Sequence, residues 1–344
     1  MKQTVLIAAL ALPLLAAAPA TVTTHRVSAV AETDPVGTMD DAADDPAIWR
    51  NAADPGKSLI IATDKRAGLH VYDLRGKALS FTPSPRLNNV DLRADVMVAG
   101  RPAVLVAASD RANEAQASIA LYTLDTATAK LVALPAVQAG AGEAYGLCLL
   151  KDANSGAVQV FSVMKDGRID HYARDLSGAA PSAKLIRSFK VETQSEGCVA
   201  DDRTGIVYVG EEDAGIWSID TKLSDAAKLE RFATVDEMQL VADVEGLAIA
   251  PSGRDGGYLL ASSQGDNSYV LFGLKDKKYK GRFRVTTGTV DGTRETDGIE
   301  LLTMPMGKDY PQGLLVVQDG DNEPSPQNFK NVSWADVKRV LKLR

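Results

Sequence analysis

Acidic residues recur along the chain at one kind of position, directly before a glycine. Three copies of this pattern carry an acidic residue and a fourth carries tyrosine; they are Glu196-Gly197, Glu245-Gly246, Asp297-Gly298 and Tyr145-Gly146. Related segments start with Asp44-Asp45 and with Asp91, while Glu143 and Asp243 lie just before two of the copies. Carboxylates that meet in one place repel each other and raise each other's pKa unless a cation lies among them. If these segments converge in the fold, the pattern indicates a cation site.

The types of side chain available favour calcium as that cation. Histidine occurs only at three widely spread positions, His25, His70 and His171, and neither cysteine is placed like a metal ligand, so a zinc site of the usual kind is excluded. Calcium accepts many flexible carboxylate ligands, whereas magnesium requires a strict octahedron and keeps its waters. The acidic residues by themselves leave one alternative open, a purely structural calcium ion.

Basic residues follow apolar segments that end in a polar tip. They are Lys65, Arg66, Arg111 and Lys165. A lone basic residue in such a place is usually solvated, but beside an acidic metal cluster it indicates a clamp for phosphate groups. The chain has a formal net charge of −7, so it accepts a polyanion only if metal ions bridge carboxylate and phosphate.

The segments that carry these residues belong to a sixfold repeat. Each unit has an apolar segment that starts with the acidic residue, then one that ends in the polar tip, then one like Gly68–Leu74, with turn residues between them. Units of about 50 residues with four strands are typical of propeller blades. The sequence therefore predicts an all-β fold, a six-bladed β-propeller of four-stranded antiparallel blades around a central channel. A solenoid is the alternative, but it needs capping ends and none is visible.

Propeller geometry places the acidic residues together, because the first strand of each unit would line the channel and begin at the same mouth. The last unit lacks an outer strand, and we expect residues 25–31 to supply it and close the ring. Helical periodicity is scarce, and its best candidate is 334–343.

The N-terminus predicts export. Lys2 precedes an apolar run over 5–18, and Ala18-Pro19-Ala20 provides a small-residue cleavage pattern, so residues 1–20 are typical of a secretory signal peptide. Residues 21–344 are then expected to form one domain, periplasmic or extracellular. The negative net charge makes nucleic acids and anionic membranes poor partners.

The two cysteines, Cys148 and Cys198, lie in apolar segments. We expect buried free thiols, with a single disulfide as the alternative that an exported protein permits.

The chain resembles the β-propeller phytases, the alkaline calcium-dependent phytases, over nearly the whole mature sequence. The resemblance rests on DAADDPAIW at 41–49, GLHVYDLRGK at 68–77, LNNVDLR at 87–93, EAYGLCL at 143–149, SEGCVADD at 195–202, DVEGL at 243–247, ETDGIE at 295–300 and VQDGDN at 317–322. It implies hydrolysis of phytate (myo-inositol hexakisphosphate), taken as a calcium complex, to lower inositol phosphates by a monomeric 3-phytase.

The resemblance also implies roles for individual residues. The catalytic calcium cluster would be held by Asp44, Asp45, Glu196, Asp243, Glu245 and Asp297, with Tyr145 and Glu212 joining calcium and phosphate in the same pocket. Substrate phosphates would be bound by Lys65, Arg66, Arg111, Lys165 and Tyr145, and structural calcium by Glu32, Asn89, Asp291 and Asp319. The chain departs from the family pattern at Arg66, Asp64 and Asp110, where the family usually has lysine, asparagine and asparagine, and in having the two cysteines.

Other chemistries fit the residues less well. No R-H-G motif supports a histidine nucleophile, no G-N-H motif supports a binuclear metallophosphatase, and neither cysteine heads a C-x5-R loop. Two alternatives stay open: a calcium propeller that acts on lactones or other phosphate esters, and a calcium-stabilised propeller that binds without catalysis.

Overall fold

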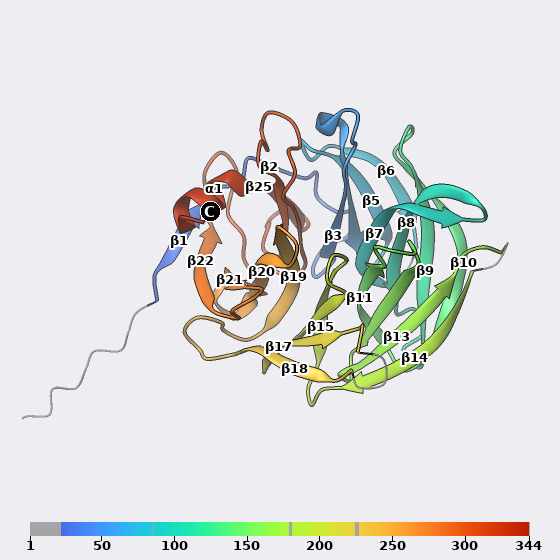
Figure 1. Cartoon of the computed structure of the whole chain (residues 1–344). Coiled ribbons are helices and arrows are strands. Elements are labelled where there is room, and N and C mark those ends of the chain that lie inside the picture. Colours follow the sequence, from blue (N-terminus) through green and yellow to red (C-terminus); the bar gives the residue numbers. More distant parts are fainter. Residues whose placement is uncertain (1–21, 85, 179–180, 224–226, 344) are drawn as a thin grey trace, which may run out of the picture.

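The strands of the protein are arranged as six sheets in a ring (Figure 1). A computed structural model describes residues 22–343, apart from 85, 179–180 and 224–226. The innermost strands of neighbouring sheets lie side by side around the axis, which confirms the predicted six-bladed β-propeller and excludes the solenoid. The predicted signal peptide lies outside the described residues.

Each of the first four blades uses four consecutive strands, from the channel outward. Blade one contains β3 (Ala43–Trp49), β4 (Leu59–Asp64), β5 (Gly68–Asp73) and β6 (Ala78–Pro83). Blade two contains β7 (Leu87–Val98), β8 (Arg101–Asp110), β9 (Gln116–Asp125) and β10 (Lys130–Ala141). Blade three contains β11 (Ala144–Lys151), β12 (Val158–Met164), β13 (Arg168–Asp175) and β14 (Ser182–Lys190). Blade four contains β15 (Ser195–Asp201), β16 (Ile206–Glu211), β17 (Gly215–Asp220) and β18 (Leu229–Thr234).

The last two blades include strands from the N-terminus. Blade five contains β19 (Val244–Ser252), β20 (Gly256–Ser263), β21 (Ser268–Gly273) and β22 (Tyr279–Val285), with β1 (Thr24–Val27) added in parallel at its outer edge. Blade six contains β23 (Ile299–Leu302), β24 (Leu314–Asp319) and β25 (Asn328–Ser333), and its outer strand is β2 (Ala31–Glu32).

Ring closure therefore differs from the expectation in its detail. Residues 25–31 do not form one outer strand of the last blade. Thr24–Val27 instead pairs with the free edge of β22 in the preceding blade, and only Ala31–Glu32 completes blade six. The predicted C-terminal helix is confirmed as α1 (Trp334–Leu341), which packs on β1 and β22 through Trp334 and Val337 (Figure 1).

Apolar side chains fill the spaces between neighbouring blades. Val71 of blade one and Val106 of blade two belong to one fully buried cluster, and Leu105 of blade two and Leu149 of blade three belong to the next. Burying each such side chain stabilises the fold by about 1.5–3 kcal/mol. The blades are thus held in fixed positions relative to each other, which fixes where their inner strands begin.

The start of each inner strand carries a β-bulge in the first five blades. In blade four, for example, Ser195 pairs with Glu211 and the next pair is Cys198 with Val209, so the inner strand has one extra residue there. The same break occurs in the other four. A bulge re-aims a side chain that would otherwise alternate across the sheet.

The glycine that follows the acidic residue lets neighbouring inner strands approach each other. A Cβ atom on Gly197 would lie 1.9 Å from the carbonyl oxygen of Glu245, and one on Gly146 would lie 1.9 Å from that of Glu196. No side chain fits at such distances from backbone. The acidic-glycine pattern therefore combines a ligand with the only residue that allows the next blade to come close.

Cys148 and Cys198 form a disulfide between β11 and β15, with their Cα atoms 5.4 Å apart. The expectation of free thiols was wrong. The two cysteines are 50 residues apart, which is one repeat of the propeller, so they occupy similar heights on adjacent inner strands and meet across the boundary between blades three and four.

We expect the double substitution Cys148→Ala/Cys198→Ala to lower the melting temperature by about 3–6 °C. Closing a loop of this length restricts the unfolded chain, and in the chain-entropy model the restriction contributes up to about 4 kcal/mol to the free energy of unfolding. Differential scanning calorimetry with and without reductant measures this. Reductant should lower the melting temperature of the wild type and leave that of the double variant unchanged; a wild type insensitive to reductant would contradict the prediction.

Candidate active site

The mouth at which the inner strands begin contains a polar cavity of about 600 Å³. Its lining includes seven of the residues that the sequence singled out: Lys65, Tyr145, Glu196, Glu212, Asp243, Glu245 and Asp297. They come from five blades and are separated by up to 232 residues in the chain. The predicted convergence of acidic residues at one mouth is therefore a feature of the structure.

Three glutamates form the closest group of carboxylates in this cavity. One oxygen each of Glu196, Glu212 and Glu245 lies within 4.8 Å of the others. Burial raises the pKa of Glu196 and Glu245 well above the ordinary value, and neighbouring carboxylates raise it further. Glu212 is less buried, and burial raises its pKa although hydrogen bonds from Gln194 oppose the change.

Two buried carboxylate oxygens at this mouth have no hydrogen-bond partner among the described residues, Oδ1 of Asp44 and Oε2 of Glu245. An unpaired buried carboxylate oxygen is costly, and a cation bound beside it removes that cost. Carboxylate oxygens are the donors that calcium prefers. The residues present therefore fit a hard cation held by oxygen.

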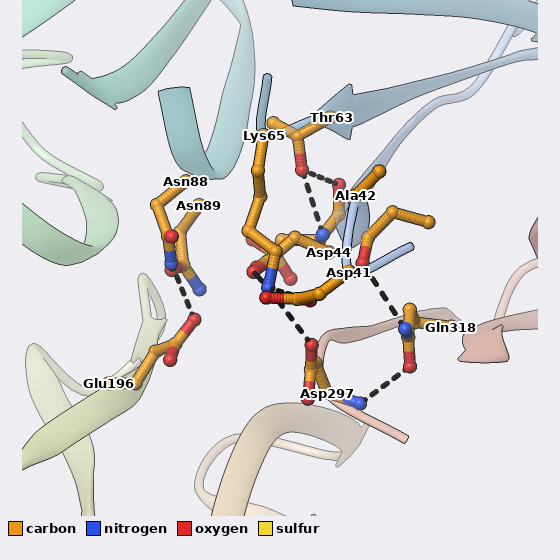
Figure 2. A network of polar contacts seen from close by, with 12 residues as sticks. Asp41, Ala42, Asp44, Thr63, Lys65, Asn88, Asn89, Glu196, Asp297 and Gln318 are labelled. Atoms are coloured by element: carbon orange, nitrogen blue, oxygen red, sulfur yellow. Dashed lines mark hydrogen bonds and ion pairs between the residues drawn. The ribbon is translucent and has the colours of Figure 1, made fainter. Parts of the chain in front are cut away.

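Lys65 lies inside the acidic cluster (Figure 2). Its Nζ is 2.7 Å from Asp41, 3.1 Å from Asp44 and 3.5 Å from Asp297. Burial lowers the pKa of Lys65, but the carboxylates outweigh burial and hold the pKa above its ordinary value. Asp297 responds in the opposite direction, since burial raises its pKa to about 7 although Lys65 opposes this. A cationic side chain is thus available within reach of any phosphate bound to the cluster.

Arg111 and Lys165 form a second basic group at the rim. Their cationic ends lie 5.0 and 5.2 Å from the centre of the Tyr145 ring, close enough for cation–π attraction. Glu143 contacts both, at 2.6 Å from Arg111 and 3.9 Å from Lys165. Burial raises the pKa of Tyr145, and the negative charge of Glu196 raises it further, so the hydroxyl group stays protonated and able to donate a hydrogen bond.

Arg66 does not join the other basic residues. Its side chain is half exposed, lies 3.5 Å from the exposed Asp40, and is not part of the cavity lining. Lys65 and Arg66 are consecutive in the turn after β4, so their side chains leave the backbone in different directions. Of the four predicted basic residues, Lys65 lines the cavity, Arg111 and Lys165 lie at its rim against Tyr145, and Arg66 does neither.

Asp45 points along the channel instead of into the cavity. Its Oδ2 accepts a hydrogen bond of 3.0 Å from the backbone N–H of Val90 in blade two. Burial, followed by repulsion from Asp44, raises its pKa well above the ordinary value. Asp243 lines the cavity and is more open to solvent, with a pKa that burial and Asp213 raise.

Asn88 takes the place that the sequence analysis gave to Asp91. In blade two the bulge falls on Asn88 and Asn89, which correspond to Asp44 and Asp45 in blade one. Asp91 lies farther along β7, where it accepts from the backbone N–H of Leu149 and pairs with an arginine. Comparing Asn88-Asn89 with Asp44-Asp45 would have revealed the right alignment, but asparagine does not stand out in a search for acids.

Asn88 connects the basic rim to the acidic cluster, and Figure 2 shows its contact with Glu196. It is fully buried, its Nδ2 donates to Glu196 at 2.7 Å, and its Oδ1 accepts from Arg111 at 2.7 Å. Two glutamines that were not predicted also donate to carboxylates of the cavity. Gln194 donates to Glu212 at 2.8 Å and Gln264 donates to Asp297 at 2.5 Å.

Three of the four residues predicted to hold structural calcium meet elsewhere, in the closing blade. Glu32, Asp291 and Asp319 surround Nζ of the fully buried Lys330, at 2.5 Å from Glu32 and 3.1 Å from Asp319. Lys330 therefore supplies positive charge among these carboxylates. Asn89 is not with them, since it lies beside Asn88 in the channel.

Comparisons with known proteins identify the family of the chain. The Phytase family model matches residues 2–343. The 3-phytase of Bacillus subtilis (strain 168) is 40% identical over 329 residues, which cover 92% of this chain and 85% of that protein. The chain belongs to the phytase family, as the sequence motifs indicated. It is therefore an enzyme, a phosphoric monoester hydrolase.

One solved structure resembles the chain only distantly. A solved structure of a functionally unknown protein from Desulfotomaculum acetoxidans DSM 771 has a TM-score of 0.48 and 13% identity, with 70% of this chain and 71% of that chain covered. In the part of the chain that the structure describes, none of the helices has the length and apolar character needed to cross a membrane.

We expect Asn88→Ala to reduce phosphomonoester hydrolysis about tenfold or more. The substitution removes hydrogen bonds to two charged groups, each typically contributing about 1.5–3 kcal/mol, and leaves Glu196 and Arg111 free to move. Initial rates of phosphate release measure the effect, and circular dichroism checks the fold. Asn154→Ala, in an exposed turn, is the matched control; equal rates for both variants would contradict a positioning role for Asn88.

Proposed function

We propose that the protein hydrolyses phytate to lower inositol phosphates in a calcium-dependent reaction. One observation carries this proposal: a cluster of buried carboxylates with unpartnered oxygens lies in one open cavity with Lys65, while Arg111 and Lys165 contact Tyr145 of the cavity lining. The carboxylates fit a hard cation and the basic residues fit phosphate. Membership of the phytase family supports the same substrate class.

Calcium would be held by carboxylates at the cavity mouth. The candidates are Asp44, Glu196, Glu212, Asp243, Glu245 and Asp297. Bound there, calcium would supply charge that bridges carboxylate and phosphate and lowers the pKa of a bound water. Asp45 is a candidate for a separate site in the channel because its carboxylate turns toward Val90.

The basic side chains would bind and orient the substrate. Lys65 lies within the cluster and would contact the phosphate that is cleaved. Arg111 and Lys165 lie around Tyr145 at the rim and would hold a neighbouring phosphate of the same molecule. Binding energy from that second phosphate contributes to catalysis when it fixes the first one in place.

A covalent cysteine intermediate has no support, because both cysteines are in the disulfide. We propose direct attack by a water molecule whose pKa the bound calcium would lower. A lactonase or a non-catalytic propeller would not need the basic group at the rim. We further propose that the protein acts as an exported monomer on the calcium complex of phytate, with no nucleic-acid or membrane partner; the disulfide supports the exported compartment.

Removal of calcium should abolish phosphate release from phytate and lower the melting temperature. A ligand present at 100 times its Kd stabilises the folded state by about 2.7 kcal/mol. Glu196→Gln, which keeps the shape but removes a charge, should lower the rate about a hundredfold at saturating calcium. Phosphate release and calorimetry with chelator and with added calcium measure both effects. Full activity and an unchanged melting temperature in chelator would refute the calcium dependence.

Lys165→Ala should lower kcat/KM for phytate roughly tenfold to a hundredfold, because a charge-assisted phosphate contact is worth about 1.5–3 kcal/mol. A simple monophosphate ester should be affected much less, since it has no second phosphate to hold. Arg66→Ala removes a nearby positive charge outside the cavity and is the matched control.

Parallel assays of both substrates with both variants at a fixed calcium concentration test whether Lys165 holds a second phosphate. Equal losses on the two substrates in Lys165→Ala would mean that Lys165 serves only the cleaved phosphate. A loss on phytate as large in Arg66→Ala would show that the effect is general electrostatics.

A further inference from the structure

A second cavity of about 530 Å³ lies where the inner strands end, at the opposite mouth of the channel. Its walls are largely apolar, and include Trp49, Leu92, Leu147, Ile249, Leu301 and Met304. The volume is in the range of small-molecule sites, which are typically apolar with a few polar groups. The proposed phytase reaction uses none of these residues.

The charged groups around this cavity are unequally balanced. Five carboxylates and three guanidinium groups line it, which leaves an excess of two acidic groups. Arg93 is 2.7 Å from Asp91 and 2.8 Å from Asp202, so these three form a closed network. Arg203 is 2.7 Å from Asp201, which makes a second closed pair.

These pairs leave over two acidic residues, Asp45 and Glu300 on β23, and one guanidinium, that of Arg50, which donates to the carbonyl oxygen of Pro305 at 3.1 Å. Glu300 lines the cavity, and within the described part of the chain no hydrogen bond or ion pair reaches its carboxylate. Burial raises the pKa of Glu300 to about 8, with Asp91 adding to the rise and Arg93 opposing it. Asp45, the other unpaired carboxylate of the lining, accepts the hydrogen bond from Val90. Glu300 thus lies beside an apolar wall without a hydrogen-bonded or ion-paired partner among the described residues, and Arg93, the cation that acts on it, is already engaged by Asp91 and Asp202.

We propose that this mouth of the channel binds a small organic cation with an apolar body, such as an alkylammonium ion, with the ammonium group at Glu300 and the alkyl chain against the wall that includes Trp49 and Leu301. An anion is disfavoured at this position because Glu300 lies near Asp91, and Arg93 is already paired with Asp91 and Asp202. A bare metal ion at Glu300 is disfavoured because Asp91, the carboxylate that acts on it, is already engaged by Arg93 and by the backbone N–H of Leu149. The apolar wall favours a ligand with a hydrocarbon part. The proposal is independent of the phytase reaction at the other mouth.

Isothermal titration calorimetry with hexylammonium tests this site in the whole protein at about pH 9, which is above the raised pKa of Glu300 and below the ordinary pKa of an alkylammonium group such as that of lysine. Hexylammonium should bind at least tenfold more tightly than methylammonium, since each buried CH₂ group contributes up to about 0.8 kcal/mol. Hexanoate, of the same length but opposite charge, should not bind measurably. Binding of hexylammonium should also change tryptophan fluorescence in the wild type but not in Trp49→Phe.

Two substitutions separate the mouths. Glu300→Gln should weaken hexylammonium binding about tenfold, while Glu245→Gln, at the acidic cluster, should leave it unchanged; melting curves check that both variants fold. The proposal is overturned if hexylammonium shows no binding at a concentration of about 10 mM. It is also overturned if methylammonium or hexanoate binds as tightly as hexylammonium, or if Glu300→Gln binds hexylammonium as tightly as the wild type does. Should Glu300→Gln fail to fold, the comparison of the three probes on the wild type decides.

Discussion

Electrostatic repulsion among buried carboxylates is the constraint around which this protein is organised. Glu196, Glu245 and Asp297 begin three adjacent inner strands, and each has a pKa raised by burial and by acidic neighbours. Such an arrangement is unfavourable unless positive charge enters it. Lys65 supplies part of that charge, and the unpartnered oxygens of Asp44 and Glu245 show where more is needed. The same need makes the site suited to a cation that also binds phosphate.

The propeller provides what is needed to hold these groups against their repulsion. Clusters of apolar side chains fix neighbouring blades, and glycines such as Gly197 let inner strands touch backbone to backbone. The disulfide joins two of these strands, and its Cys198 is two residues after Glu196. Gln318 links blade six to blade one, because its Oε1 accepts from the N–H of Asp297 at 2.8 Å and its Nε2 donates to Ala43 at 3.2 Å (Figure 2). The ring is thus closed at the level of the site.

Repetition made most of the fold and much of the site predictable. A sixfold pattern with an acidic residue at one register of the repeat places those residues at one mouth, and Tyr145, Glu196 and Asp297 do lie there. Residues that depart from the repeat were missed or assigned to the wrong position. Asn88 replaces a carboxylate at its register, so a search for acids selected Asp91 instead.

The directions of side chains, the partners of the N-terminal strands and the pairing of the cysteines could not be predicted from the sequence either. Lys65 and Arg66 are adjacent and similar in charge, yet only the turn geometry decides which one enters the cavity. The N-terminal segment could pair with the free edge of β22 or with that of β25. Thr24–Val27 pairs with β22, where α1 packs against it. Cys148 and Cys198 are one repeat apart, but their meeting depends on the side-chain directions of two neighbouring strands.

Calcium affinity measured by calorimetry on two variants tests the central claim most directly. Glu245→Gln removes a carboxylate from the cluster, and Glu300→Gln removes one from the same channel at its other mouth. Since calcium affinity follows the number of charged ligands, Glu245→Gln should bind calcium at least about tenfold more weakly than the wild type. Glu300→Gln should retain the wild-type affinity. Equal calcium affinity in the wild type and in Glu245→Gln would contradict the account.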